Sequence, residues 1–446
     1  MIYIQTIAEC ASKMNDTIII NSASTPATTP TASAGKQRRL IIATSLGNGL
    51  EIFDFTIYSF FALLIGKLFF PAEGEYTSLM MSLATFGVGF ITRPIGAILI
   101  GNYADRHGRK AALTLTIILM TLGTALIGLA PTYAQIGIAA PLIILAGRMV
   151  QGFSAGGEVG AATTLLMESG SNHGRGYRVS FQLASQGIAA LIGALFATLL
   201  STKLSPASLE SWGWRVPFLL GLSIGPVGLF IRRHLEETHT QEECQHSAFR
   251  DLILGHWKRV LLGIGMMIGG TSTMYIMVFY MPSYMIKTLG LSAQTSFLSS
   301  CLSGAIMFVF APLGGILADR MRLRKPLLMF LSILLLVIIY PAFLLFQEHP
   351  SLPVILVVVG VVVMLKSLIA PAGTLLLLEG FPRAIRVSGL AVVYSLGVTF
   401  FGGFAQLTVT WLISVTGNPM APAWYLTSCL VISIIALQAF REQPQD

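Results

Sequence analysis

The chain of 446 residues is 54% hydrophobic and only 11% charged, and its mean hydropathy is +0.75. Soluble domains carry about 25% charged residues, so this composition argues against a water-soluble protein and favours lipid as the solvent. The net charge of +8 lies mainly in short loops between apolar runs, which is typical of membrane orientation and not of nucleic-acid binding. The four cysteines lie far apart and form no metal-binding spacing.

Twelve apolar runs follow the polar, Ser/Thr/Ala-rich residues 1–39, and most have about the 20 residues that cross the hydrocarbon core of a bilayer. The expected spans cover 41–65, 78–100, 111–130, 136–167, 180–200, 216–231, 260–284, 296–317, 327–346, 353–377, 388–412 and 424–440. We therefore expect an all-α integral membrane protein with twelve transmembrane helices in two six-helix bundles. Its expected parts are a disordered cytoplasmic tail 1–39, a bundle 40–232, a cytoplasmic linker 233–258, a bundle 259–441 and a tail 442–446.

The basic residues predict the orientation of these spans. Of the 28 Lys and Arg residues, 21 lie in the tails and even-numbered connections, 4 lie on the opposite side, and Arg93, Arg148 and Lys366 fall inside spans. Cytoplasmic loops carry an excess of Lys and Arg. We therefore expect a multi-pass protein of the cell inner (plasma) membrane with both termini in the cytoplasm.

The two halves repeat one another. The loop after span two reads Gly-Asn-Tyr-Ala-Asp-Arg-His-Gly-Arg-Lys at 101–110, and the loop after span eight contains Ala-Asp-Arg at 318–320. Asp105 and Asp319 are 214 residues apart, close to the offset between spans one and seven. A parallel duplication of six spans places a substrate site at the interface of the halves, near the middle of the membrane.

Several motifs resemble those of the major facilitator superfamily. The signature loop is similar at Gly101, Asp105, Arg106, Gly108, Arg109 and Lys110, and the span-four motif is similar at Arg148, Gln151, Gly152 and Gly156. Within the superfamily, the chain resembles the metabolite:proton symporters at 51–58, 93–96, 151–160, 212–217 and 235–238. Segments 69–73, 78–81 and 416–425 are most similar to citrate and related tricarboxylate:proton symporters.

The signature loops are candidate gates. A charge pair between an Asp of such a loop and the other half would hold one conformation shut and break in the other. The expected gating residues are Gly101, Asp105, Arg106, Gly108 and Arg109 in the first half, and Asp319 and Arg320 in the second. The alternative is that these charges only solvate the loops and set the topology.

Six charged residues interrupt the apolar runs. A charge at the centre of a bilayer costs about 2.5–3.5 kcal/mol on insertion scales, so each of these residues is expected to be paired or functional. The six are Glu51, Asp54, Arg93, Arg148, Glu158 and Lys366. Because three acids balance three bases, static pairing that holds the bundle together stays an alternative to a functional role.

Proton coupling is expected from the acidic residues. Asn48, Glu51, Asp54, Phe55 and Tyr58 recur every three to four residues and share one broad face of span one. A carboxyl group beside a poorly hydrated cavity suits proton exchange. Asp54 and Glu51 are therefore the expected proton carriers. Arg148 is expected to tune them, and Glu158 is a further candidate whose alternative role is to cap the cytoplasmic half of span four.

Substrate binding is expected from the cations and from polar helix faces. Arg93 from the first half and Lys366 from the second would clamp an anion across the interface, because charged side chains hold carboxylates through strong hydrogen bonds. Tyr58, Gln182, Gln186 and Tyr275 are expected to complete the site.

These observations predict a secondary transporter that carries a carboxylate metabolite, citrate or a related di- or tricarboxylate, into the cell with protons by alternating access. The alternatives are a proline/betaine-type osmolyte symporter and a non-transporting membrane sensor. No catalytic triad, zinc spacing or phosphate-binding loop predicts an enzyme or a cofactor. The expected partners are a small organic anion, protons and membrane lipid, with no nucleic acid, and the chain is expected to function as a monomer.

Overall fold

Long helices joined by short connections make up the protein, whose computed structural model describes residues 34–74, 76–107, 109–156, 158–170, 174–223, 225–226, 245–382 and 385–442. The helices of the first half are α2 (Ala34–Phe60), α3 (Ala62–Phe69), α4 (Thr77–His107), α5 (Arg109–Gly128), α6 (Tyr133–Ile136), α7 (Ala139–Ala155), α8 (Glu158–Glu168), α9 (Arg175–Lys203), α10 (Pro206–Ser208), the π-helix η1 (Leu209–Gly213) and α11 (Arg215–Leu222). The helices of the second half are α13 (Gln245–Met274), the π-helix η2 (Tyr275–Tyr280), α14 (Met281–Lys287), α15 (Ala293–Arg320), α16 (Lys325–Glu348), α17 (Leu352–Glu379), α18 (Arg386–Val398), the π-helix η4 (Thr399–Gly403), α19 (Ala405–Thr416) and α20 (Ala421–Ala439).

The expected membrane spans coincide with these helices. In the described ranges, eight helices are long and apolar enough to cross a membrane, and the pair α2 and α3, bent by 64°, makes up to nine. Shorter apolar helices at Thr114–Gly128 and Ala139–Ala155 stand where spans three and four were expected, and α11 covers residues 216–222 of span six. The predicted all-α architecture with twelve spans is confirmed.

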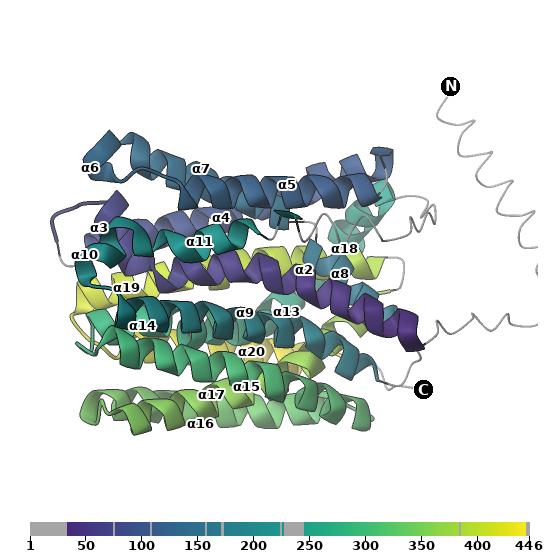
Figure 1. Cartoon of the computed structure of the whole chain (residues 1–446). Helices are drawn as coiled ribbons and strands as arrows, with labels where there is room; N and C mark the ends of the chain where they lie inside the picture. The colour runs from purple at the N-terminus through teal and green to yellow at the C-terminus, as the bar shows by residue number, and fades with distance from the viewer. Residues whose placement is uncertain are drawn as a thin grey trace, which may run out of the picture.

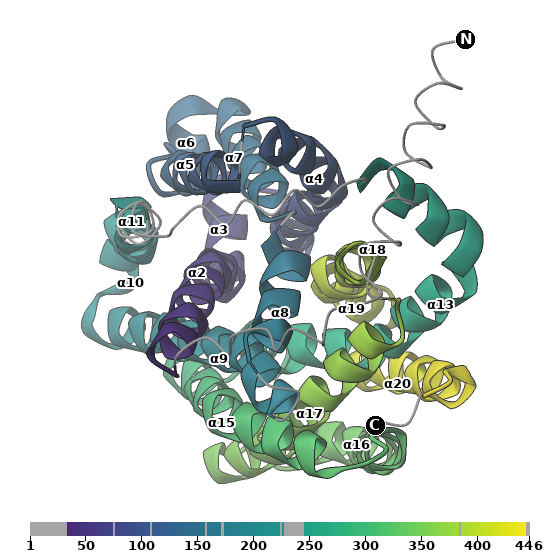
Figure 2. The same ribbon diagram turned by 90° about the vertical axis from the view of Figure 1, so that its right-hand side faces the viewer.

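The helices lie side by side along one long axis (Figure 1). We call the end of the bundle where α2 begins and α20 ends the N/C end, and the other end the opposite end. Figure 2 looks onto the N/C end, with α4, α5 and α7 of the first half on one side and α15, α16 and α17 of the second half on the other. Helices α2, α8, α9, α18 and α19 lie between these outer groups, so the interface of the halves runs through the middle of the molecule.

Helices α9 and α15 form the closest contact between the halves. A Cβ atom on Gly176 would lie 2.5 Å from the carbonyl oxygen of Gly315, and one on Gly304 would lie 2.7 Å from that of Gly187. Only glycine allows two backbones to approach this closely. We call this contact the α9–α15 seam.

The glycines of the span-four motif bring α7 against α4. A Cβ atom on Gly152 would lie 1.5 Å from the carbonyl oxygen of Gly89, and one on Gly156 would lie 1.9 Å from that of Arg93. Sequence similarity alone gave these glycines no physical role. The structure shows that they let α7 press against the segment of α4 that carries Arg93.

Several helices extend further than the apolar runs predicted. Helix α4 continues to His107 and α5 begins at Arg109, so most of the expected loop 101–110 is helical. Helix α13 begins at Gln245, inside the expected linker, and changes direction at His256, where φ is −129° and ψ is 17°. Similarly, α2 begins at Ala34, inside the expected tail. Polar residues at the end of an apolar run can stay helical outside the membrane, which hydropathy alone does not detect.

Candidate functional site

A cavity of about 170 Å³ lies between the two halves. One water molecule occupies roughly 30 Å³ in the liquid, so the cavity has room for a small organic solute. Its lining residues are Thr163, Val179, Ser180, Gln182, Leu183 and Gln186 from the first half, and Met266, Met267, Gly270, Thr271, Met274, Tyr275, Lys366, Ile369, Ala370, Pro371, Gly373, Thr374, Leu377, Leu390, Tyr394 and Val398 from the second. The first half thus contributes mainly amides and hydroxyls, and the second contributes an apolar wall.

Lys366 is the one charged side chain among these lining residues. It lies in the middle of α17 and is only 6% exposed. Its Nζ atom donates to the thioether of Met274 at 3.5 Å, and no acidic partner within 4.0 Å is found in the part of the chain that the structure describes. A buried ammonium group is normally paired. Lys366 therefore presents its amino group to the cavity with no acidic partner among the described residues.

The polar wall comes from the start of α9 and from α8. The hydroxyl of Thr163 donates to the side-chain carbonyl oxygen of Gln182, and the amide of Asn48 on α2 donates to the Gln182 backbone carbonyl at 2.9 Å. Gln186 lies one turn further along α9 and interacts with the hydroxyl of Tyr394 from α18. Gln182 and Gln186, both predicted, therefore lie together on the cavity, and Tyr394 joins them from the other half.

Arg93 and Glu51 form an ion pair beside the cavity. The Arg93 Nη2 atom lies 3.6 Å from Glu51 Oε1, and both side chains are buried. The guanidinium group also lies 4.3 Å from the ring centre of Phe90 and 4.8 Å from that of Phe55. Two aromatic faces and a carboxylate therefore surround this cation, while its Nε and Nη2 atoms make no hydrogen bond within the described residues. Arg93 is not among the cavity-lining residues.

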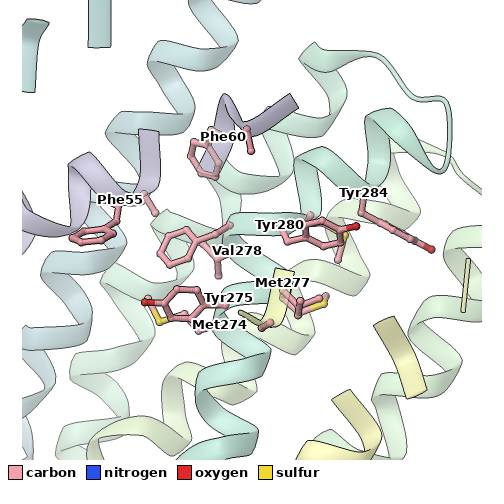
Figure 3. Close-up of a cluster of buried hydrophobic side chains, with 14 of the residues drawn as sticks. Phe55, Phe60, Met274, Tyr275, Met277, Val278, Tyr280 and Tyr284 are labelled. Carbon is pink, nitrogen blue, oxygen red and sulfur yellow. The ribbon is translucent and has the colours of Figure 1, made fainter. Parts of the chain in front are cut away.

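Tyr275 connects this aromatic group to the cavity. Its ring contacts that of Phe90, with centroids 5.8 Å apart, and its side chain lines the cavity. Figure 3 shows Tyr275 on η2, with Phe55 on the neighbouring α2. The predicted site residue Tyr275 is thus at the cavity wall, and Phe90 lies in contact with both Tyr275 and Arg93.

Asp54 and Arg148 belong to a second buried network, inside the first half. Asp54 Oδ2 accepts from the hydroxyl of Thr124 and, at 3.4 Å, from the amide of Gln151. Arg148 donates to Gln151 Oε1 at 2.8 Å and lies 3.7 Å from the ring centre of Tyr58. The network lies between α2, α5 and α7 and contributes no residue to the cavity lining. The predicted residues Asp54, Arg148 and Tyr58 are therefore together, but not at the cavity.

The opposite end is closed by contacts between the halves. Ser59 on α2 donates to Gln406 on α19 at 2.9 Å, and Phe60 and Phe61 contact Phe297 on α15. Ser59 also donates to the backbone carbonyl of Phe279 on η2 at 3.3 Å. Access to the cavity from this end requires these contacts to separate.

Charges bridge the halves at the N/C end. Asp319, at the end of α15, accepts from the backbone N–H groups of Gly176 at 2.6 Å and Tyr177 at 2.9 Å, at the first turn of α9. Glu379 pairs with Arg324 of its own half and lies 3.7 Å from Arg175 of the other. The predicted gating residue Asp319 thus contacts the other half.

A second bridge at this end joins Arg386 of α18 and Glu168 of α8, whose charged atoms are 3.8 Å apart. Access to the cavity from the N/C end therefore requires several ion pairs and hydrogen bonds to break.

The remaining predicted residues make no contact with the cavity or are only partly described. Gly101 lies within α4, where an added Cβ atom would meet nothing within 4 Å, and Arg320 is exposed at the end of α15. The side chains of Asp105, Arg106, Arg109 and Glu158, together with Gly108, lie outside the described residues.

Sequence reasoning missed Tyr394 and the methionines of α13, because a tyrosine or methionine in an apolar run carries no distinctive signal. No cluster of three or more metal-binding side chains occurs in the described ranges.

Comparisons with known proteins identify the family of the chain. The Major Facilitator Superfamily matches residues 44–406. The chain is 36% identical over 423 residues to a citrate-proton symporter of Klebsiella pneumoniae, an alignment that covers 93% of this chain and 94% of that protein. It is 33% identical over 425 residues to the proline/betaine transporter of Escherichia coli (strain K12), with 92% and 84% covered.

Among solved structures, the D-xylose-proton symporter superposes with a TM-score of 0.75 at 18% sequence identity, covering 90% of this chain and 97% of that one. At this identity the likeness shows the fold alone. The family match and the sequence relatives confirm the superfamily and the resemblance to citrate-proton symporters that the motifs predicted.

Proposed function

This chain belongs to the Major Facilitator Superfamily, and we propose that it is a proton-coupled symporter that carries a carboxylate metabolite into the cell by alternating access. The observation that carries this proposal is Lys366, a buried cation that faces a cavity between the halves and has no acidic partner in the described ranges. A carboxylate in the cavity would provide the missing counterion through a charge-assisted hydrogen bond.

The cavity favours an anion over a zwitterion. Relatives named for citrate and for proline or betaine match this chain to a similar degree. A zwitterion also brings a positive charge, which an acidic side chain or a cage of aromatic rings would stabilise. The described lining residues include no acid, and their one charge is positive. The ammonium end of an osmolyte would thus meet Lys366 without a compensating carboxylate.

Alternating access follows from the two sets of contacts between the halves. The cavity lies between aromatic and polar contacts at the opposite end and ion pairs at the N/C end. Opening either set while the other stays closed would expose the cavity to one side of the membrane. The excess of Lys and Arg on the N/C side supports a cytoplasmic location for that end, in a protein of the plasma membrane. One chain builds the whole cavity, which supports function as a monomer.

Proton coupling is assigned to the buried carboxyl groups of α2. Asp54 Oδ2 accepts hydrogen bonds from Thr124 and Gln151, while Oδ1 has no hydrogen-bond partner among the described residues. Glu51 pairs with Arg93, next to the aromatic residues that reach the cavity wall. Asp54 is our first candidate for the proton carrier and Glu51 the second, with Arg148 as the nearby cation that biases Asp54.

Uptake into proteoliposomes tests the function. Labelled citrate, other di- and tricarboxylates, monocarboxylates, proline and glycine betaine are supplied with and without a pH gradient that is acidic outside. We expect accumulation of carboxylates only with the gradient, and no accumulation of proline or betaine. Accumulation of the osmolytes alone would assign the chain to the other transport class, and absence of uptake of any solute would favour a sensor.

A further inference from the structure

The charge balance of the cavity narrows the substrate class. We infer that the cavity accepts an organic acid with a single ionised carboxylate, which binds Lys366, while the rest of the molecule enters uncharged. This inference rests on the proposed function, because it assumes that the cavity binds a carboxylate. It goes beyond that function by setting how many negative charges the site tolerates.

The first step is the number of cations that can reach the substrate. Lys366 is the only cation among the described lining residues. Arg93, which would be the second member of an anion clamp, already has a carboxylate partner. It pairs with Glu51 and lies against the rings of Phe55 and Phe90. Its side chain is 2% exposed and does not line the cavity. The clamp of Arg93 and Lys366 is therefore not assembled around this cavity.

Arg148 does not supply the second charge either. It is fully buried inside the first half, bonded to Gln151 and placed over the ring of Tyr58. A second ionised carboxylate in the cavity would consequently have no cation within the described wall. Its desolvation would go uncompensated, and the cost of burying an unpaired ion in a protein is several kcal/mol.

The second step is the chemistry of the remaining wall. Around Lys366 the second half supplies thioethers and aliphatic groups, among them Met274, Met267 and Leu377. Across the cavity lie the neutral hydrogen-bonding groups of Gln182 and Gln186, with Tyr394 beside them. These groups can donate to or accept from a hydroxyl, a carbonyl, an ester or a protonated carboxyl group. The wall thus suits one ionised carboxylate, an apolar body and uncharged polar substituents.

A charge series at nearly constant shape tests the inference. The probes are propane-1,2,3-tricarboxylate and its mono-, di- and trimethyl esters, which carry three, two, one and no ionised carboxylates at pH 8. Binding to the purified protein is measured by calorimetry. We expect the tightest binding for the dimethyl ester, with at least a tenfold loss for each further ionised carboxylate and a loss for the neutral trimethyl ester. Affinity that rises with charge, or that ignores it, would overturn the inference.

A variant pair separates the role of Lys366 from a change in shape. Lys366→Met should weaken the dimethyl ester by roughly ten- to a hundredfold while leaving the trimethyl ester unchanged, so the charge preference disappears. Lys203→Met, at an exposed lysine at the end of α9, is the control and should keep the preference. If Lys366→Met keeps the preference, Lys366 is not the carboxylate ligand and the inference is wrong.

The outcomes distinguish this inference from the proposed function. Proton-driven uptake of carboxylates with the strongest preference for the triply ionised acid would keep the function and reject the single-charge rule. Uptake of osmolytes alone, with no binding of any member of the ester series, would reject both.

Discussion

Replacement of Asp319 by Asn should open the N/C end. The Asp319 carboxylate accepts two backbone hydrogen bonds from Gly176 and Tyr177, and so ties the end of α15 to the first turn of α9 in the other half. An Asn side chain has one neutral acceptor oxygen. One of the two hydrogen bonds is therefore lost, and the other is no longer made to a charged group. Hydrogen bonds to charged groups contribute about 1.5–3 kcal/mol and neutral ones about 0.5–1.5 kcal/mol.

The expected change is about 2 kcal/mol in the equilibrium between the bridged and open forms of the N/C end, because Asp319 is partly exposed and solvent weakens its bonds. This corresponds to roughly a thirtyfold shift toward the open form. Cavity-lining residues are not altered, so substrate affinity measured for the open form should stay the same.

The rate at which a cysteine in the cavity is labelled measures this shift. Thr374 lines the cavity on α17, five residues before Glu379. Thr374→Cys is introduced into a chain whose own cysteines are replaced, and a membrane-impermeant maleimide is added from the N/C side of the membrane. Asp319→Asn should raise the labelling rate about thirtyfold, whereas Asp319→Glu, which keeps both acceptor oxygens, should raise it much less. A rate within threefold of the parent, in a protein that unfolds at the parent's temperature, would refute the gating role.

Three further substitutions probe coupling, packing and the first-half loop. Asp54→Asn should abolish accumulation driven by a pH gradient without unfolding the protein, because the substitution removes a titrating group and hardly changes the side-chain volume. Accumulation at the parent's level would instead assign proton transfer to Glu51, which Glu51→Gln tests. Gly221→Ala places a Cβ atom 2.5 Å from Asp54 Oδ1, so thermal unfolding should report a loss of about 1–3 kcal/mol, against none for Gly255→Ala, where the space is open. Asp105→Asn should slow uptake with little change in equilibrium substrate binding, and a collapse of binding would mean that segment 101–110 shapes the site itself.

The sequence predicted the membrane helices well because the length and apolarity of each run are direct requirements of the bilayer. It placed their ends less well. Helix α13 begins 15 residues before the expected span at 260, since residues outside the lipid can continue a helix without being apolar. The π-helices η2 and η4 were not predicted, because no residue pattern in an apolar run marks one extra residue in a turn.

For the candidate site, the sequence identified the charged residues but not their partners. Lys366 stood out because a lone lysine in an apolar run needs a reason, and it does line the cavity. Arg93 stood out equally, yet it lies against Phe90 and pairs with Glu51. Whether Arg93 or Lys366 has an acidic partner depends on how α2 and α4 pack, and this packing is a property of the tertiary structure. Tyr394 reaches the cavity from α18 for the same reason.

The α9–α15 seam has a consequence for how such proteins diversify. At the seam, the backbones of Gly176 and Gly315 leave no room for a methyl group. We therefore expect any substitution of these glycines to be disfavoured for steric reasons alone. The cavity wall is built differently, from side chains such as Met274 and Gln186 that project from helices held in place elsewhere. A single exchange in that wall can alter selectivity without disturbing the frame. Proteins that share this frame can therefore diverge in cargo faster than in architecture.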